Sequence, residues 1–247
     1  MLTGPQISAD TVTDSAARNL RNNWDQTRKR IATAVNRYGR LCDSVGLVAI
    51  SKGHPASALR AVAGFGQRDF GENYLQEALP KIQALAGLSL SWHFTGQLQA
   101  NKTRTIAEHF HWVHTLDRER IAVRLNDQRS HDAPPLNVCL QVSLEDEPGK
   151  GGVPPEQVLD LARRIQDLPK LRLRGLMCIP PPRESFEEQR ALFEQLAGCQ
   201  RRLIEAGCAV DTLSMGMSAD LEAAVAAGAT WVRIGTAIFG ERVKQST

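Results

Sequence analysis

Short apolar runs rich in β-branched residues alternate along this chain with longer stretches rich in Ala, Leu, Glu and Arg. The alternation begins at Gly46 and is typical of repeated strand and helix units that build a parallel sheet. The runs that predict strands are Leu47–Ser51, Asp69–Gly71, Trp92–Thr95, Trp112–Thr115, Asn137–Ser143, Arg172–Ile179, Thr212–Met215 and Trp231–Ile234. Eight such units in 247 residues favour a single closed (β/α)8 barrel, an α/β fold, over an open doubly wound sheet, which usually has fewer strands.

The remaining segments fit one domain preceded by a helix. Residues 1–14 are polar and predict a flexible tail, and the segment from there to Arg40 carries apolar residues at a roughly helical spacing. We therefore expect a leading helix and a single β/α barrel domain over residues 15–247. Two stretches rich in Gly and Pro, 128–136 and 145–155, are predicted to be loops between barrel elements.

Charge and cysteine content narrow the functional classes. The 30 basic and 27 acidic side chains give a net charge of +3, and no long run of one sign marks a nucleic-acid surface. The five cysteines are an odd number at irregular spacing, which favours reduced thiols and a cytoplasmic protein over a disulfide framework. No secretory signal or apolar stretch of membrane-spanning length stands out, so we expect no membrane partner.

Lys52 follows directly on the first predicted strand. Functional residues of a β/α barrel lie at the C-terminal ends of its strands, and strict alternation puts Lys52 on the same side as Val48 and Ile50, facing the interior. Loss of hydration there would favour the neutral amine, which is the form that attacks an aldehyde. A lone lysine at a strand end is more often a solvated surface residue, so other features of this end of the barrel must decide.

The seventh and eighth predicted strands both end in glycine and hydroxyl residues, within LSMGMSAD (213–220) and RIGTAIFGER (233–242). β/α barrels often bind phosphate between these two loops, through exposed backbone N–H groups and through hydroxyls. The candidate phosphate ligands are Ser214, Ser218, Gly235 and Thr236. The structural alternative is that Ser218 caps a helix from Ala219 to Ala227 and that Gly235 only lets the backbone bend.

Three further residues are candidates for ligand contact. Arg233 lies two residues before Gly235 and therefore on the same face of its strand. Because a guanidinium only donates hydrogen bonds, opposite a pyridine nitrogen it would keep that nitrogen unprotonated and weaken the ring as an electron sink. Asn73 and His93 follow or end the second and third strands, where Asn73 could instead begin a helix and His93 could be a hydrogen-bonded barrel residue.

No metal site is expected from the histidines at 109, 111 and 114, because they straddle a helix end and a strand and should not converge. The segment PGKGG (148–152) lacks the spacing of a nucleotide-binding loop. The expected ligand is therefore neither a metal nor a nucleotide held by such a loop.

Several strings of the chain match one known family in order: AISKGHP around Lys52, FGENYLQE, HFTGQLQANK, RLRGLMCIPPP and LSMGMSADLEAAVAAGATWVRIGTAIFG. From about Leu20 to Arg242 the chain resembles the pyridoxal phosphate homeostasis proteins, relatives of the N-terminal barrel of alanine racemase. The resemblance implies a fold-type III barrel that carries pyridoxal 5′-phosphate (PLP) as a Schiff base on Lys52. It also implies a phosphate site in the strings that contain Ser214, Ser218, Gly235 and Thr236, with the pyridine nitrogen near Arg233.

Members of this family are thought to buffer or deliver PLP and to maintain vitamin B6 and amino-acid balance, without an established catalytic turnover. The alternative is a PLP-dependent amino-acid racemase or lyase with weak activity. Alanine racemase needs a second acid/base group, a tyrosine from another domain, and here the only tyrosines are Tyr38 and Tyr74, neither obviously opposite Lys52. A third alternative is a barrel enzyme that acts on sugar phosphates without PLP. It is less favoured because such an enzyme would not require a lysine, an arginine and a phosphate site in this arrangement.

The resemblance therefore favours a monomeric, non-catalytic carrier whose partners are PLP and PLP-dependent apoenzymes. Two departures from the family pattern concern the pocket. Gly53 and His54 stand where many relatives have a threonine and another residue, and Thr95 stands where a larger apolar residue is expected.

Overall fold

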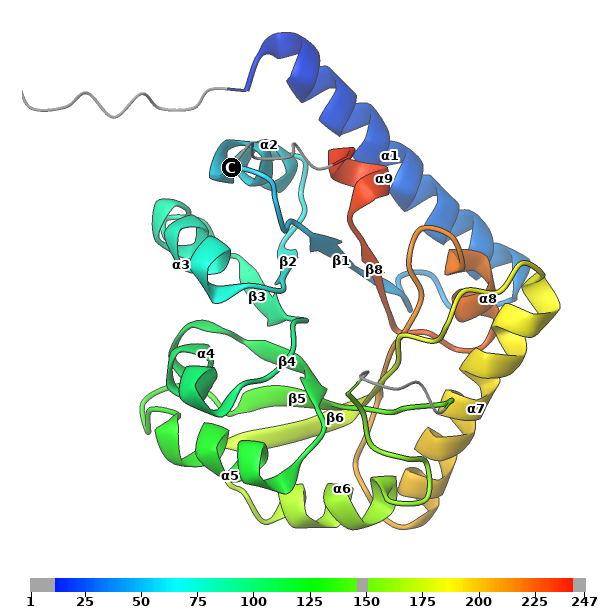
Figure 1. Ribbon diagram of the computed structural model, residues 1–247. Helices are drawn as coiled ribbons and strands as arrows, with labels where there is room; N and C mark the ends of the chain where they lie inside the picture. The colour runs from blue at the N-terminus through cyan, green and yellow to red at the C-terminus, as the bar shows by residue number, and fades with distance from the viewer. Residues whose placement is uncertain (1–11, 146–150, 242–247) are drawn as a thin grey trace, which may run out of the picture.

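The computed structural model describes residues 12–145 and 151–241, and within them eight strands form a closed barrel. Each strand pairs in parallel with the next, and the last pairs with the first, so that the predicted barrel is confirmed. The strands are β1 (Gly46–Ile50), β2 (Asp69–Glu72), β3 (Ser91–Phe94), β4 (Trp112–Leu116), β5 (Leu136–Gln141), β6 (Leu171–Met177), β7 (Thr212–Ser214) and β8 (Trp231–Ile234). Figure 1 shows the helices arranged around this ring of strands.

A leading helix, α1 (Asp14–Arg37), precedes the barrel as predicted, and a helix follows each strand. These helices are α2 (Ala56–Gly64), α3 (Leu75–Ala84), α4 (Thr103–His109) with a short 3-10 turn η1 (Ala100–Lys102) before it, α5 (Glu119–Gln128), α6 (Val158–Gln166), α7 (Phe186–Glu205), α8 (Leu221–Ala226) and α9 (Thr236–Phe239). The longest of the helices that follow a strand, α7, begins with a capping box in which Ser185 and Glu188 satisfy each other's backbone N–H groups.

The alternation of side chains along each strand separates two apolar layers. In β1, Leu47 and Ala49 join the large cluster between the sheet and the helices, whereas Val48 lies outside that cluster and is also fully buried. A Cβ atom added to Gly71 of β2 would meet both Val48 and Ile50, so these two side chains face the same way, into the barrel. This is the orientation that the alternation in the sequence predicts.

Aromatic rings pack together in the middle of the barrel. The rings of His93 and Trp112 stack with centroids 5.5 Å apart, and Trp231 meets His93 edge-on at 5.4 Å. The guanidinium of Arg174 lies 4.9 Å from the centroid of Trp112. The barrel is therefore a packed core and not a pore, so a ligand has to bind at one of its ends.

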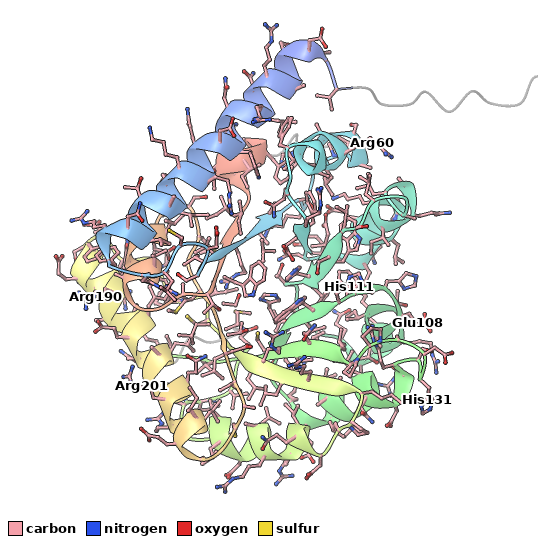
Figure 2. All side chains as sticks on the ribbon, turned by 180° about the vertical axis from the view of Figure 1, so that it is seen from behind. Arg60, Glu108, His111, His131, Arg190 and Arg201 are labelled. Atoms are coloured by element: carbon pink, nitrogen blue, oxygen red, sulfur yellow. The ribbon has the colours of Figure 1, made fainter. Side chains whose placement is uncertain are left out.

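Charged side chains cover the outside of the helical ring, where Arg60, Arg190 and Arg201 are exposed to solvent (Figure 2). No helix in the described part of the chain is both long enough and apolar enough to cross a membrane.

The helix α1 lies against α8 and α9, which follow the seventh and eighth strands (Figure 1). Asn23 donates to the carbonyl oxygen of Ile238 at 3.1 Å, and Arg30 forms a two-pronged ion pair with Glu222. Of the predicted flexible tail, residues 1–11 lie outside the described part, and Asp14 already belongs to α1, whose first turn is capped by Thr13. The predicted loop at 145–155 also lies partly outside it, at residues 146–150.

Candidate functional site

The carboxyl ends of β7, β8, β1 and β2 are neighbours around the barrel, so the loops that follow them meet at one end. A close approach occurs at Gly235, where an added Cβ atom would lie 3.1 Å from the carbonyl oxygen of Ile50. Only a residue without a side chain fits comfortably against the backbone there. Gly235 thus lies beside Ile50, the last residue of β1, which precedes Lys52 by two residues. A phosphate site at Gly235 would therefore be close to the lysine.

Lys52 lies in the turn between β1 and α2 and is half-buried. The residues on both sides of it are held by side chains from the next βα unit. Ser51 donates its hydroxyl to Oε1 of Glu72 at 2.6 Å, and the backbone N–H of Gly53 donates to Oε2 of Glu77, also at 2.6 Å. The backbone that carries the lysine is therefore fixed from β2 and α3.

A buried ion pair lies beneath this turn. Nζ of Lys81 lies 2.7 Å from Oε1 of Glu72 and donates to the carbonyl oxygen of Ser51 at 2.8 Å. The Glu72 side chain is fully buried, and burial raises the pKa of its carboxyl group, with Lys81 acting in the opposite direction. Its second oxygen, Oε2, has no hydrogen-bond partner within the described residues.

Sequence reasoning missed this pair. Glu72 ends β2 inside the string FGENYLQE, and Lys81 follows nine residues later on α3, four residues after Glu77. A carboxylate at the end of a buried strand, with a lysine two helical turns into the next helix, is a pattern that could have predicted the ion pair. The contacts of this pair with Ser51 could not be predicted in the same way, because they depend on how the ends of β1 and β2 lie against each other.

The departure at Gly53 and His54 has a structural reason. Gly53 has φ +77°, a left-handed conformation that favours glycine over threonine. The ring of His54 stacks on Phe239 of α9 with centroids 5.0 Å apart. This stack connects the Lys52 turn to the helix that follows β8.

Arg233 lies inside the barrel, just below the carboxyl end of β8, and only 5% of it is exposed. Nη1 donates to the hydroxyl of Ser214 at 2.9 Å, and Nη2 donates to the carbonyl oxygen of Cys178 at 2.8 Å. Burial lowers the pKa of Arg233 from its usual value. These bonds fix the plane of the guanidinium and use two of its five N–H donors.

The hydroxyl of Ser214, a candidate phosphate ligand, is committed to the barrel interior. Besides accepting from Arg233, it lies 2.7 Å from Nδ1 of His114 and is completely buried. The hydroxyl of Ser214 is therefore bonded to Arg233 and to His114 of β4.

The loop between β7 and α8 is held from two sides. Arg30 of α1 donates to the carbonyl oxygen of Ser218 at 3.1 Å, and the carboxylate of Asp220 accepts the N–H of Met217 at 2.6 Å. The helix α8 begins at Leu221 with Asp220 as its N-cap residue, so Ser218 is not the helix cap of the structural alternative. Across from this loop, Gly235 and the exposed Thr236 begin α9.

Asn73 follows β2 and is half-buried at the same end of the barrel. Thr95 donates its hydroxyl to Oδ1 of Asn73 at 3.0 Å, which gives the departure at Thr95 a role in orienting this amide. His93, in contrast, is completely buried within the barrel, where it contacts Asp69 and His114. It is a hydrogen-bonded barrel residue, and His114, which sequence reasoning considered only as a metal ligand, is its partner.

The histidines at 109, 111 and 114 do not share a partner. Nδ1 of His109 bonds the carbonyl oxygen of Thr105, and Nδ1 of His111 accepts the N–H of Trp92. Within residues 12–145 and 151–241, no three acidic, histidine or cysteine side chains gather as metal ligands would.

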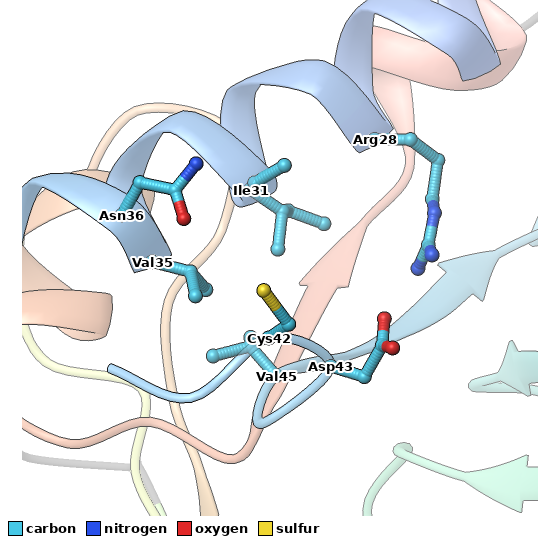
Figure 3. Close-up of a pocket in the computed structure, with 8 residues that line it drawn as sticks. Arg28, Ile31, Val35, Asn36, Cys42, Asp43 and Val45 are labelled. Atoms are coloured by element: carbon cyan, nitrogen blue, oxygen red, sulfur yellow. The ribbon is translucent and has the colours of Figure 1, made fainter. Parts of the chain in front are cut away.

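Two cavities lie at opposite ends of the barrel. One, of about 160 Å³, lies between α1 and the segment from Cys42 to Val45 that leads into β1, so it is at the N-terminal end of that strand (Figure 3). The other, of about 200 Å³, is lined by Gln141, Ser143 and Cys178, at the carboxyl ends of β5 and β6. This second cavity adjoins the candidate site, because the carbonyl group of Cys178 binds Arg233.

The chain is similar to known proteins over most of its length. Residues 17–243 match the family described as the alanine racemase N-terminal domain. The chain is 53% identical to the pyridoxal phosphate homeostasis protein of Pseudomonas aeruginosa, over 90% of this chain and 96% of that protein. It is 49% identical to the protein of the same name from Escherichia coli, over 90% of this chain and 97% of that one.

Two solved structures share the fold. PipY of Synechococcus elongatus, solved with PLP bound, aligns with a TM-score of 0.76 at 39% identity, over 85% of this chain and all of that one. Alanine racemase of Clostridium difficile aligns with a TM-score of 0.74 at 16% identity, over 91% of this chain but only 57% of the racemase. The second likeness concerns the barrel alone.

Proposed function

Since the chain belongs to the family of pyridoxal phosphate homeostasis proteins, as its motifs indicated, we propose that it binds PLP and carries it as a Schiff base on Lys52. The observation that supports this most directly is the arrangement around the lysine. Glu72, Lys81 and Glu77 hold Ser51 and Gly53 on either side of a half-buried lysine that directly follows a barrel strand. When bound, PLP supplies an aldehyde, and the amine replaces its oxygen, which leaves as water.

The residues of the site fit the rest of the cofactor. Gly235 lies where a side chain would crowd the backbone of β1, and the loop of Ser218 is clamped by α1. We propose that Ser218, Gly235 and Thr236 bind the phosphate through hydroxyl and backbone N–H groups. Ser214 contributes through Arg233, because its hydroxyl already accepts from that guanidinium.

Arg233 is proposed to face the pyridine nitrogen, with Asn73, which follows β2, as a further contact at the same end of the barrel. A cation that only donates hydrogen bonds keeps the nitrogen unprotonated, so the ring would be a poor electron sink. Reactions that pass through a carbanion are then disfavoured, and the bound cofactor is preserved. This chemistry suits storage and delivery of PLP to apoenzymes, and so the maintenance of vitamin B6 and amino-acid balance.

The positions of the tyrosines favour the same conclusion over a racemase or lyase. Tyr38 caps the end of α1 and stacks on Phe186 with ring centroids 6.1 Å apart. Tyr74 is 53% exposed at the start of α3. Neither side chain is built into the site as a second acid/base group. We further propose that the carrier is a cytoplasmic monomer, because no second domain is needed to complete this site.

A transfer assay separates the carrier from the enzyme. The protein is loaded with PLP, freed of unbound cofactor, and mixed with an apoenzyme that requires PLP, while a parallel sample receives L-alanine. We expect the apoenzyme to regain activity and D-alanine to form no faster than with free PLP. Turnover of the amino acid without transfer would identify an enzyme. Lys52→Ala, treated in the same way, should transfer little because it retains little cofactor after desalting.

A further inference from the structure

A continuous line of hydrogen bonds crosses the inside of the barrel and ends at Arg233. Oδ1 of Asp69 lies 2.9 Å from Nε2 of His93, whose Nδ1 lies 2.9 Å from Nε2 of His114. Nδ1 of His114 lies 2.7 Å from the hydroxyl of Ser214, which accepts from Arg233 at 2.9 Å. We call these five residues the interior chain.

The interior chain connects the two ends of the barrel. Asp69 is the first residue of β2, and 26% of its side chain is exposed at the end away from the proposed cofactor site. His93, His114 and Ser214 are completely buried. Arg233, at the other end of the line, is the residue proposed to face the cofactor ring. The members between these ends have no surface exposed to bulk solvent.

Donor and acceptor chemistry allows only one direction along this chain. Arginine only donates, so Ser214 accepts from it, and a carboxylate only accepts, so Nε2 of His93 must carry a proton. Burial lowers the pKa of both His93 and His114, although Asp69 acts in the opposite direction on His93, and therefore favours neutral rings with one donor nitrogen each. His93 therefore accepts at Nδ1 from Nε2–H of His114.

The remaining proton position follows from the same rule. Nδ1 of His114 bears a lone pair, so the hydroxyl of Ser214 donates to it. Each link of the chain then joins a donor to an acceptor, from Nη1 of Arg233 at one end to the carboxylate of Asp69 at the other. The reversed direction would bring the lone pair of His93 Nε2 against the carboxylate of Asp69, which is repulsive.

We propose that Asp69, His93 and His114 are positioning residues that fix the hydroxyl proton of Ser214 and, through it, the guanidinium of Arg233. With its proton directed to His114, Ser214 presents a lone pair to Nη1 of Arg233, and the carbonyl group of Cys178 holds Nη2. The inference rests on the proposed function only in assigning Arg233 to the cofactor ring. The proton arrangement itself belongs to the protein without any ligand.

Nuclear magnetic resonance of the ligand-free protein tests the chain directly. With ¹⁵N-labelled histidine at neutral pH, His93 and His114 are both expected as neutral Nε2–H tautomers. The exposed His109 and His131 serve as internal references. A neutral Nδ1–H tautomer or a charged ring at either buried position would overturn the proposal, whether or not the protein binds PLP.

Substitution at the far end tests the positioning role. Asp69→Ala removes the group that sets the direction, so the Nε2–H tautomer of His93 should lose population. PLP should bind about tenfold more weakly, the value of one hydrogen bond to a charged group, while labelling of Lys52 persists. Asp211→Ala is the matched control, because Asp211 precedes β7 at the same end and bonds Arg174 and Thr212 instead.

The outcomes separate the two claims. Unchanged tautomers or unchanged PLP affinity in Asp69→Ala, or an equal loss of affinity in Asp211→Ala, would refute the positioning role. Failure of the unsubstituted protein to bind PLP would refute the proposed function, and the histidine tautomers would still decide the direction of the chain.

Discussion

At the scale of single residues, burial determines how the thiol groups react. Burial raises the pKa of Cys139 and of Cys178 to about 12, so both remain protonated thiols at neutral pH. Cys199 and Cys208 are also buried, whereas Cys42 is exposed in the segment that leads into β1. The proximity of Cys178 to Arg233 therefore does not make it a nucleophile.

This distribution predicts the course of thiol titration. Of the five cysteines, we expect one, Cys42, to react rapidly with a disulfide reagent in the folded protein and the other four to react only on unfolding. The measurement is the absorbance of the released thiolate over time, and Cys42→Ser should remove the rapid phase. Rapid reaction of a second thiol in the folded protein would contradict the burial described.

The backbone conformation at Gly53 favours glycine over other residues. At φ +77° an alanine is strained, so Gly53→Ala should lower the free energy of unfolding by about 1 kcal/mol. Gly87→Ala is the control, because an added Cβ atom there meets nothing within 4 Å and no left-handed φ is required. Urea denaturation of both variants gives the comparison, and an equal effect at the two positions would argue against the strain.

At the scale of elements, the buried pair between β2 and α3 supports the Lys52 turn. Lys81→Met leaves the carboxylate of Glu72 buried without its cation, and such losses cost about 3–5 kcal/mol of stability. Adding Glu72→Gln should restore most of this free energy. Arg21→Ala, which breaks an exposed pair with Asp25, should cost less than 1 kcal/mol. Urea denaturation measures all three, and a loss for Lys81→Met no larger than for Arg21→Ala would refute the role of the pair.

The elements themselves were largely predictable from the sequence, because β-branched runs and glycine-rich ends mark barrel strands. The predicted strands were too long at their carboxyl ends. The fifth was expected to reach Ser143 and the sixth Ile179, but β5 ends at Gln141 and β6 at Met177. The apolar residues beyond these points line the cavity beside the site, so their hydrophobicity continues after the pairing has stopped.

Partners that come from distant elements were not predictable. Lys52 and Arg233 could be predicted as candidates because alternation along a strand gives an expected direction for each side chain. The contact of Ser51 with Glu72 joins the ends of two neighbouring strands, and the contact of Ser214 with His114 joins β7 and β4, which are 100 residues apart in the sequence. Only the closed barrel brings them together, so the residues that support the site were missed.

At the scale of the whole molecule, buried neutral histidines link folding to pH. Burial lowers the pKa of the fully buried His93 and His114 below the usual value of 6.5, and partial loss of hydration lowers that of the more exposed His111. For a group with a lowered folded pKa, the contribution to stability is complete above the unfolded pKa and is lost as pH falls toward the folded pKa. Each such histidine contributes a slope of up to about 1.4 kcal/mol per pH unit.

The protein should therefore be less stable at pH 5.5 than at pH 7.5 when the free energy of unfolding is measured in urea. Glu72 acts in the opposite direction, because burial raises its pKa, but a single carboxyl opposes three histidines. Replacing the exposed His109 by Gln should leave the slope unchanged. Equal or greater stability at the lower pH would contradict the burial of neutral rings in the barrel.

The central claim is that PLP binds covalently to Lys52. An absorbance spectrum with added PLP tests it most directly. The spectrum is taken before and after borohydride reduction, and the labelled peptide is then mapped by mass spectrometry. We predict a visible Schiff-base band that reduction removes, with the label on Lys52, no label in Lys52→Ala, and normal labelling in the half-buried control Lys102→Ala. The absence of the band, or a label on another lysine, would contradict the proposed function.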